Sequence, residues 1–436
     1  MINKKINIIT LGCSKNVVDS EKLLKQINEG GYEIVHNSDE ASGGTVIINT
    51  CGFINDAKEE SIDTILRYVK AREAGNFENL FVIGCLSERY KEELKQEIPQ
   101  VDKYFGVNDM NDILNELGLK FRKDLLTERT ITGPGHYAYL KISEGCNRTC
   151  AFCAIPAIRG KYISYPFDEL VTEASKLADK GVRELILIAQ DLSYYGIDLY
   201  RKQSLPDLVN ELLKIESLEW IRLHYLYPTN FPMELIPLIR ENTRICNYID
   251  IPVQHITDKM LGLMRRSHNR KETEAVLHKL RSDIPEASIR TTLIVGHPGE
   301  TEKDFSELKD FISEFRFDRL GVFSYSHEED TYAYNNYEDE IPNKVKESRV
   351  AELMDLQQKI SAELNKSRIG KVMKIIIDRQ EGEFLVGRTE YDSPEVDQEV
   401  LIEIEHDLTP GSFYNVRITQ SNEFDLFGTP VDPHIP

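Results

Sequence analysis

The sequence lacks long apolar runs. No stretch of about 18 consecutive apolar residues occurs, so no membrane-spanning helix is predicted. The first residues, Met1 to Lys5, lead directly into a strand-like run and lack the apolar core of a secretory signal. We therefore expect a cytoplasmic protein without a membrane partner.

Positive charge is also scarce. The 436 residues carry 53 Lys plus Arg against 73 Asp plus Glu, which gives a formal net charge of −20. Non-specific binding to DNA or RNA depends on clustered cations that neutralise phosphates. Nucleic acid is therefore not expected as a direct substrate, and a basic protein is the electrostatically easier partner.

Cysteine is scarce as well, but its placement is informative. The chain has 7 cysteines, and Cys146, Cys150 and Cys153 form the pattern C-x3-C-x2-C directly after a strand-like run at 138–142. In a cytosolic protein, grouped cysteines indicate a metal site or catalysis. The next cysteine is Cys246, which we interpret as a free buried thiol, so the loop supplies three thiolates and no fourth.

The presence of three thiolates in one loop distinguishes between zinc and an iron-sulfur cluster. Structural zinc closes its tetrahedron with four protein ligands, and catalytic zinc usually has His or carboxylate among its three. Thiolates alone suit an iron-sulfur cluster. The pattern therefore favours a four-iron cluster with one open iron, and the alternative is a zinc site completed by a distant His.

A second group of cysteines follows three strand-like runs near the start of the chain. The runs at 6–11, 45–49 and 80–83 alternate with helical patterns, which predicts an open, doubly wound α/β sheet. Cys13, Cys51 and Cys85 each follow one run, with a glycine beside each. Because the carboxyl ends of parallel strands share one edge, we expect a second three-thiolate site there. The alternative is three unrelated buried cysteines.

Polar residues beside this second group are candidates for binding. Ser14, Lys15, Asn16 and Asn49 lie next to the cysteines and are able to donate hydrogen bonds to a cluster or a substrate. On a loop, the same residues are equally explained as solvated polar side chains.

The chain is too long for one ordinary domain. At about 150 residues per domain, two to four domains are expected. Gly133-Pro134-Gly135 breaks the pattern and indicates a linker. We predict an N-terminal cluster domain at 1–124, a linker at 125–135, a barrel at 136–367 and a small β domain at 368–436.

The middle section alternates strands and helices. Six strand-like runs predict a partial (β/α)6 barrel whose open side admits a macromolecule: 138–142, 184–189, 220–225, 248–253, 288–295 and 320–324. Chemistry in such barrels lies at the carboxyl ends of the strands. The three-cysteine loop follows the first strand, and polar or Gly-rich turns begin after later strands at Gln190, Gln254 and Gly296.

The last section is β-rich. Runs at 372–377, 384–389, 400–404 and 413–418 predict a small antiparallel barrel of about five strands that resembles an OB fold. From Lys371 to Pro436 the sequence has 5 Lys plus Arg against 14 Asp plus Glu. This barrel should repel a phosphate backbone and attract a basic protein.

Both cysteine groups and the C-terminal barrel together resemble the radical S-adenosylmethionine (AdoMet) methylthiotransferases. That family joins an N-terminal cluster domain, a radical AdoMet barrel and a TRAM domain. The stretches 11–20, 49–54, 188–191 and 387–392 resemble the branch that modifies an aspartate of the basic small-subunit ribosomal protein S-twelve. The Tyr-Gly-Cys-Gln opening that is usual in the tRNA-modifying branch is absent.

The resemblance implies the cofactors and their ligands. Two 4Fe-4S clusters are expected, one on each cysteine group, with AdoMet on the open iron of the cluster at Cys146, Cys150 and Cys153. A 5′-deoxyadenosyl radical would take hydrogen from the aspartate β-carbon, and sulfur carried on the other cluster would be added as a methylthio group. Further AdoMet contacts are predicted at Phe152, Gln190, Arg222, Gln254 and Gly296.

The resemblance also implies partners and leaves alternatives. We expect a ribosomal protein substrate, an electron donor such as flavodoxin or ferredoxin, and a monomeric enzyme. The same-class alternative is methylthiolation of a tRNA adenosine beside the anticodon. The alternative of another class is a non-catalytic, metal-stabilised binding protein.

Overall fold

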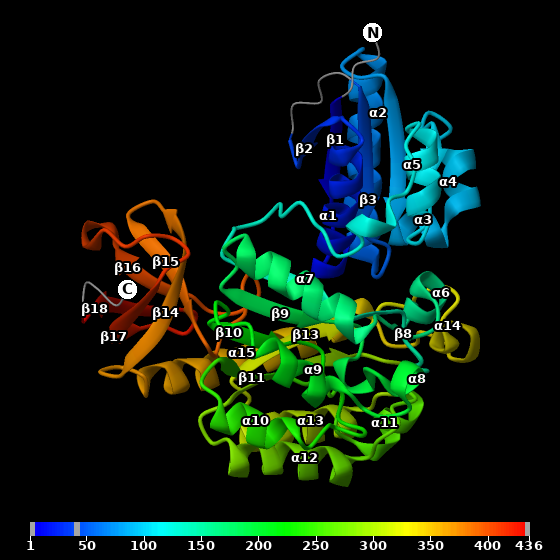
Figure 1. Cartoon of the computed structure of the whole chain (residues 1–436). Coiled ribbons are helices and arrows are strands. Elements are labelled where there is room, and N and C mark those ends of the chain that lie inside the picture. Colours follow the sequence, from blue (N-terminus) through cyan, green and yellow to red (C-terminus); the bar gives the residue numbers. More distant parts are fainter. Residues whose placement is uncertain (1–4, 39–43, 432–436) are drawn as a thin grey trace.

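The computed structural model describes residues 5–38 and 44–431, which form three successive parts (Figure 1). The first is a five-stranded parallel sheet in the order β2-β1-β3-β4-β5. The predicted strands are confirmed as β1, β3 and β4. The strands are β1 (Lys5–Thr10), β2 (Glu33–His36), β3 (Thr45–Thr50), β4 (Asn79–Gly84) and β5 (Lys103–Tyr104). The edge strands β2 and β5 were not predicted, because β2 is not fully buried and β5 has only 2 residues.

Helices cover both faces of this sheet, as predicted for a doubly wound fold. Ile6, Ile8 and Phe81 pack against α1 and α5 on one face, while Ile48 and Val82 pack against α2 and α4 on the other. The helices are α1 (Ser14–Glu29), α2 (Asn55–Glu73), α3 (Cys85–Arg89), α4 (Lys91–Glu97) and α5 (Met110–Glu116), followed by the 3-10 turn η1 (Lys123–Leu125).

The second part is a six-stranded parallel sheet in the order β13-β12-β11-β10-β9-β6. Because β6 and β13 do not pair with each other, the barrel is partial, which confirms the predicted (β/α)6 architecture. Its strands are β6 (Tyr137–Lys141), β9 (Glu184–Ile188), β10 (Trp220–Leu223), β11 (Ile245–Asp250), β12 (Ser288–Val295) and β13 (Arg319–Ser324), with a short hairpin of β7 (Ser143–Glu144) and β8 (Ile163–Ser164).

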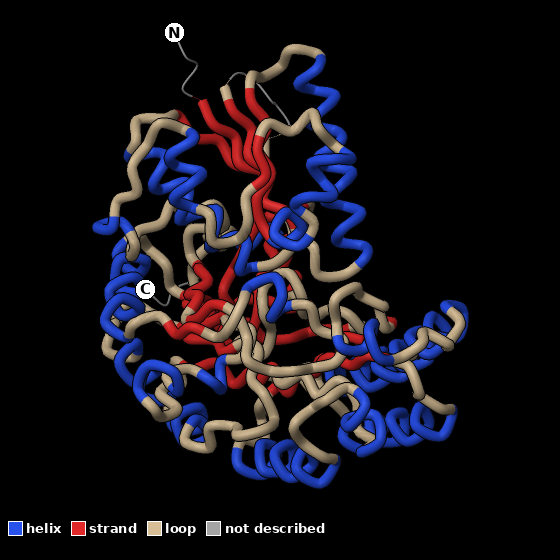
Figure 2. Tube along the Cα trace, turned by 90° about the vertical axis from the view of Figure 1, so that its right-hand side faces the viewer, coloured by secondary structure: helices blue, strands red, loops and turns tan. Residues whose placement is uncertain are grey.

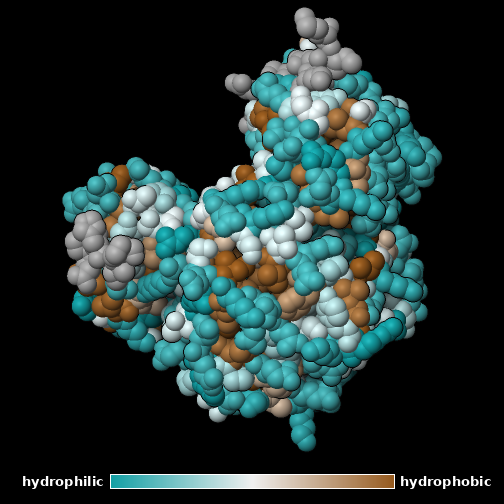
Figure 3. Space-filling view, in the orientation of Figure 1, coloured by the Kyte–Doolittle hydropathy of each residue, from teal (hydrophilic) through white to brown (hydrophobic). Residues whose placement is uncertain are grey.

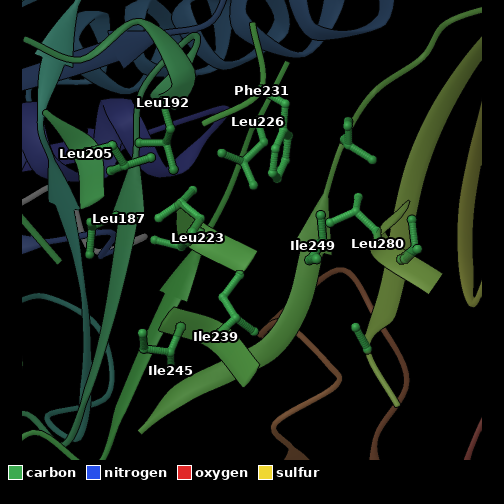
Figure 4. Packing of buried hydrophobic residues seen from close by; sticks show 14 of the residues in the cluster. Leu187, Leu192, Leu205, Leu223, Leu226, Phe231, Ile239, Ile245, Ile249 and Leu280 are labelled. Atoms are coloured by element: carbon green, nitrogen blue, oxygen red, sulfur yellow. The ribbon is translucent and has the colours of Figure 1, made fainter. Parts of the chain in front are cut away.

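Helices pack on the outer face of this sheet and form the largest core. Leu187, Leu223 and Ile249 project from neighbouring strands towards helix residues such as Leu205 and Leu280 (Figure 4). The main helices are α7 (Phe167–Asp179), α9 (Leu205–Leu212), α10 (Leu235–Glu241), α12 (Arg270–Asp283), α13 (Glu302–Phe315) and α15 (Asn343–Lys366). Shorter ones are α6 (Ile155–Arg159), α8 (Ile197–Tyr200), α11 (Asp258–Leu263), α14 (Tyr332–Asn336) and η2 (Leu192–Tyr194).

The third part is a closed barrel in the order β14-β15-β16-β18-β17. One detail differs from the predicted antiparallel barrel, because β16 and β18 pair in parallel and close it. The strands are β14 (Val372–Glu381), β15 (Phe384–Thr389), β16 (Val400–Glu403), β17 (Phe413–Ser421) and β18 (Leu426–Pro430), with η3 at Ile404–His406.

The segment after β15 enters the concave face of the partial barrel and meets buried arginines. Asp392 accepts a hydrogen bond from Arg319 Nε at 2.8 Å, and Asp397 pairs with Arg290 at 3.4 Å. Glu390 accepts from the Asn247 side chain at 2.9 Å. Several of the acidic groups counted in this domain are therefore neutralised or bonded inside the protein, and the negative charge that reaches solvent is smaller than the sequence count indicates.

The N-terminal sheet stands above the central barrel (Figure 2). Val18 of α1 packs on Tyr139, Ile186 and Ile188, which lie on the concave face of the barrel sheet. The carboxyl ends of the N-terminal strands therefore face the barrel. The space-filling view shows a mostly hydrophilic surface with hydrophobic side chains gathered over the central part (Figure 3).

Two other sequence predictions bear on this architecture. Within the described residues, no helix is both long and apolar enough to span a bilayer. The domain limits at 124, 135 and 367 stay predictions. The predicted linker contains Arg129, which is buried and pairs with Glu21 of α1 at 3.2 Å and Glu173 of α7 at 3.0 Å.

Candidate active site

The cysteine loop, Gly145–Cys153, follows β6 and β7 at the carboxyl edge of the barrel sheet. Gly145 has φ +70°, and a methyl group there would lie 2.2 Å from the carbonyl oxygen of Lys161. Only glycine fits this position. The Cys146 amide donates to the Gly160 carbonyl at 3.1 Å, and the Cys153 amide donates to the Cys150 carbonyl at 3.2 Å. Backbone hydrogen bonds thus hold the loop as a tight turn that keeps its cysteines together.

Cationic and aromatic side chains surround Cys150. Arg266 Nη1 donates to Cys150 Sγ at 3.2 Å, and Tyr227 Oη lies 3.9 Å from the same sulfur. The guanidinium groups of Arg148 and Arg266 lie 3.9 and 4.1 Å from the ring centroid of Tyr227. Arg148 also donates to Asp191 at 2.8 Å. Arg266 therefore places positive charge directly beside the Cys150 sulfur.

Burial opposes ionisation of the other thiols. It raises the pKa of Cys146 to about 11 and raises the pKa of Cys153 still further, with the neighbouring cysteines adding to both shifts. Such thiols are protonated at neutral pH. A cluster bound at this loop would therefore displace the protons of Cys146 and Cys153.

The N-terminal cysteines also converge. Cys13 and Cys51 follow β1 and β3, and Cys85 begins α3 directly after β4. A methyl group on Gly12, whose φ is +86°, would lie 2.7 Å from Cys51 Cβ and 3.1 Å from its Sγ. Burial raises the pKa of Cys85 to about 12, and the charges of Cys13 and Cys51 contribute to the shift. The three thiols lie at the carboxyl edge of the N-terminal sheet. Because Gly12 has no side chain, Cys51, directly after β3, can approach the end of β1 closely.

The two cysteine groups lie beside each other. Cys85 packs against Ala154 and Ile158, which immediately follow the cysteine loop, and α3 lies beside α6 (Figure 1). Arg159, also on α6, donates to Asn16 Oδ1 at 2.7 Å. This arginine also pairs at 3.0 Å with Glu144, which directly precedes the cysteine loop. One guanidinium therefore connects the segments that carry the two cysteine groups.

Asn16 fixes the N-terminal side of this contact. Its side chain donates to the carbonyls of Leu11 at 2.9 Å and Thr50 at 3.1 Å, which lie just before Cys13 and Cys51. The Cys85 thiol is 3.9 Å from Asn16 Oδ1. Asn16 was predicted as a hydrogen-bond donor to cluster or substrate, and here it holds two strand ends together.

The predicted AdoMet contacts do not all lie together. Phe152 and Gln254 line one cavity of about 760 Å³, which reaches Phe53 next to the N-terminal group. Gln190 stays at the carboxyl end of β9. At Gly296, φ is +75° and a methyl group would lie 2.4 Å from Lys346 Cγ, so this side of the turn is occupied by α15.

The prediction for Arg222 needs correction. Its side chain is fully buried and donates to Glu184 at 2.7 Å and to the Glu390 carbonyl at 2.8 Å. It therefore joins the barrel to the C-terminal domain and is not available for the AdoMet carboxylate. Alternation along β10 turns residue 222 to the concave face, but the sequence does not show that another domain fills that face.

Sequence reasoning also missed residues at the site. Arg148 lies within the cysteine loop, so the sequence already places it near the cysteines. Its contact with Tyr227 could not be predicted from the sequence. Arg266 is 116 residues from Cys150 in the chain, and no local pattern marks it. Such long-range partners become apparent only when the barrel closes around the loop.

The donor set fits an iron-sulfur cluster. Cys146, Cys150 and Cys153 supply thiolates from a short loop, and an arginine hydrogen bond to sulfur is among the protein contacts that tune such clusters. The adjoining cavity provides room for a ligand of ordinary cofactor size. The fold and this site together define a radical AdoMet enzyme, in which a 4Fe-4S cluster and AdoMet are the cofactors.

Comparison with known families finds a match for each of the three parts of the chain. Residues 5–106 match the uncharacterized protein family UPF0004, residues 140–312 match the radical SAM superfamily, and residues 369–431 match the TRAM domain. A relative from Bacteroides fragilis called ribosomal protein uS12 methylthiotransferase RimO is 55% identical over 429 residues, covering 98% of this chain and 99% of that protein. One of the same name from Flavobacterium psychrophilum is 54% identical over 427 residues, covering 98% of each chain.

The chain belongs to the RimO family of radical AdoMet methylthiotransferases. This confirms the resemblance described from its sequence. Among solved structures, the radical AdoMet methyltransferase TsrM from Kitasatospora setae has a TM-score of 0.55, with 13% identity, covering 73% of this chain and 72% of that one. The cobalamin-dependent AdoMet radical enzyme OxsB has a TM-score of 0.51, with 11% identity, covering 81% of this chain and 56% of that one. These likenesses show a shared fold.

Proposed function

We propose that this enzyme adds a methylthio group to the β-carbon of an aspartate in ribosomal protein uS12, using two 4Fe-4S clusters and AdoMet. The observation that carries the proposal is the adjacency of the two cysteine groups. Cys85 packs on Ala154 and Ile158, and Arg159 reaches Asn16 from the end of α6. A group activated at one site is therefore within reach of the other.

We assign the radical step to the cysteine loop. When bound there, the cluster and AdoMet supply a radical that takes hydrogen from an unactivated carbon, which no side-chain base can do. Cys146, Cys150 and Cys153 hold the cluster, while Arg266 and Tyr227 orient Cys150. Phe152 and Gln254 line the neighbouring cavity, where they would contact AdoMet and limit the access of water.

We assign sulfur delivery to Cys13, Cys51 and Cys85 with a second cluster. Asn16 holds the strand ends that carry Cys13 and Cys51, and Cys85 faces the barrel. The cavity that Phe152 lines also reaches Phe53, close to Cys51. A substrate loop in this cavity would contact Phe53 and Phe152, which are close in sequence to the two cysteine groups.

The charge of the protein suits a basic substrate. The chain carries a net charge of −20, which favours the approach of a basic ribosomal protein and disfavours nucleic acid. On the C-terminal barrel, Glu403 and Glu405 are exposed to solvent, whereas Asp392 and Asp397 are buried against arginines. We also propose a cytoplasmic monomer that receives electrons from a flavodoxin or ferredoxin.

The direct test is the mass of the substrate. Anaerobically reconstituted enzyme, given AdoMet, a reductant and a sulfide source, should raise the mass of unmodified uS12 by about 46 Da, the increment of a methylthio group that replaces hydrogen. Fragmentation should place the increment on an aspartate. An unchanged mass of uS12, together with a methylthiolated adenosine in tRNA treated in parallel, would support the tRNA alternative instead.

A further inference from the structure

Lys15 has a mostly buried side chain and no anionic partner among the described residues. Its exposed fraction is 7%, and its Nζ lies 3.8 Å from the ring centroid of Tyr225. Within residues 5–38 and 44–431, Lys15 forms no ion pair, whereas the buried lysines Lys141 and Lys346 pair with Glu144 and Asp339. The methylene stem of Lys15 is buried, whereas its ammonium keeps contact with solvent. The ammonium is therefore free to bind an anionic group that approaches from solvent.

The ammonium group lies at the mouth of the barrel. Lys15 is in the first turn of α1, two residues after Cys13, and Val18 one turn later packs on the concave face of the barrel sheet. Tyr225 follows the carboxyl end of β10. Two residues further on, Tyr227 reaches Cys150 at 3.9 Å. From the helix that follows Cys13, Lys15 thus contacts the barrel segment whose Tyr227 lies beside Cys150.

The backbone that holds this aromatic ring is strained. Tyr225 has φ +62°, a region that bulky residues rarely adopt. Its amide donates to Asp250 Oδ2 at 3.0 Å, and its carbonyl accepts from the Leu192 amide at 3.0 Å. Surrounding hydrogen bonds therefore impose the strain, and strain of this kind is concentrated at functional sites.

The nearby carboxylates are already bound by other cations. Asp19, one turn after Lys15, pairs with Lys141 and with Arg159. Asp250, which holds the Tyr225 amide, pairs with Arg290 at 3.1 Å. A carboxylate brought by a substrate would complete the pairing of Lys15 without breaking an existing ion pair.

We propose that Lys15 binds the side-chain carboxylate of the target aspartate and so positions its β-carbon between the two cysteine groups. This inference rests on the proposed function. It makes Lys15 a specificity-determining residue, because a carboxylate forms an ion pair with the ammonium, whereas a neutral carboxamide or nucleobase forms only a hydrogen bond to it. Lys15 is already placed for this contact before the substrate arrives.

The test compares uS12 with a uS12 variant that has asparagine in place of the target aspartate. Binding to the reconstituted full-length enzyme is measured for the native enzyme and for Lys15→Met. Native enzyme should bind the aspartate form about 10- to 100-fold more tightly, as expected for a hydrogen bond to a charged group. Lys15→Met should bind both forms equally. Lys25→Met is the matched control on the same helix, because Lys25 pairs with Glu29 in partly exposed positions, and it should keep the native preference.

Stability separates a binding role from a structural one. Replacing Lys15 with methionine should leave the thermal midpoint unchanged or raise it, because no ion pair among the described residues is lost and methionine still fills the space of the buried stem. A lower midpoint, or an unchanged preference for the aspartate form in Lys15→Met, would overturn the inference. Failure of the native enzyme to methylthiolate uS12 would instead refute the proposed function.

Discussion

Cys150→Ala should reduce the formation of 5′-deoxyadenosine and of methylthiolated uS12 to background. The cysteine loop supplies three thiolates, and removing the one bonded to Arg266 at 3.2 Å leaves the cluster with two protein ligands. Cluster chemistry depends on thiolate ligation, and no other group replaces the radical that the cofactors supply. The measurement is anaerobic incubation with AdoMet and dithionite, followed by chromatography of the nucleoside and mass spectrometry of uS12.

Two other cysteine variants give this prediction its controls. Cys246→Ala should retain both products, because Cys246 is buried among Trp220, Tyr248 and Ile376, far along the chain from both groups. Cys51→Ala should still form 5′-deoxyadenosine but should not methylthiolate uS12, because only the N-terminal group is affected. If Cys51→Ala methylthiolated uS12 at the native rate, the N-terminal group would have no part in sulfur delivery.

Glu184→Ala should destabilise the protein by about 3–5 kcal/mol, the cost of removing one partner from a buried charge network. Glu184 is fully buried and pairs at 2.7 Å with Arg222 of the barrel and at 2.7 Å with Arg388 of the C-terminal domain. Its loss leaves two buried guanidinium groups short of a carboxylate. Urea denaturation followed by tryptophan fluorescence suits this measurement, because Trp220 packs on Phe413 at the same interface.

The matched control lies at the edge of that interface. Glu219 pairs with Lys374 at 2.7 Å across the same two domains, but both side chains are partly exposed at 34% and 41%. Glu219→Ala should therefore cost less than about 1 kcal/mol. Equal losses for the two variants would show that burial of the Glu184 network does not govern attachment of the C-terminal domain.

These contacts show that the C-terminal domain is joined to the partial barrel by buried ion pairs. Arg388, His136 and Asp378 extend the Glu184 network across the boundary, with Asp378 2.5 Å from Arg388 and 2.8 Å from His136. Carboxylates of the segment after β15 fill the concave face, which would otherwise expose Arg290 and Arg319. The acidity of this domain thus has a structural use as well as a use in attracting a basic substrate.

The sequence predicted features that depend on local patterns. Apolar runs ended at Cys13, Cys51 and Cys85, and the rule that parallel strands share a carboxyl edge was enough to place these residues together. The spacing of Cys146, Cys150 and Cys153 indicated a cluster, because all three predicted ligands lie within one loop. Their role as ligands stays a prediction.

Features that depend on distant partners were not predicted. Arg222 was assigned to AdoMet, but its carbonyl partner on Glu390 is 168 residues away in the chain. The parallel closure between β16 and β18 depends on the path of the chain around the barrel, which alternation along a strand does not encode. The bridge from Arg159 to Asn16 likewise spans 143 residues.

Counting iron in anaerobically purified protein shows whether each cysteine group holds its own cluster. The native enzyme should contain about eight irons per chain, and alanine at Cys13, Cys51 and Cys85 should lower this to about four, as should alanine at Cys146, Cys150 and Cys153. About four irons in the native enzyme, unchanged by loss of the N-terminal cysteines, would contradict the account.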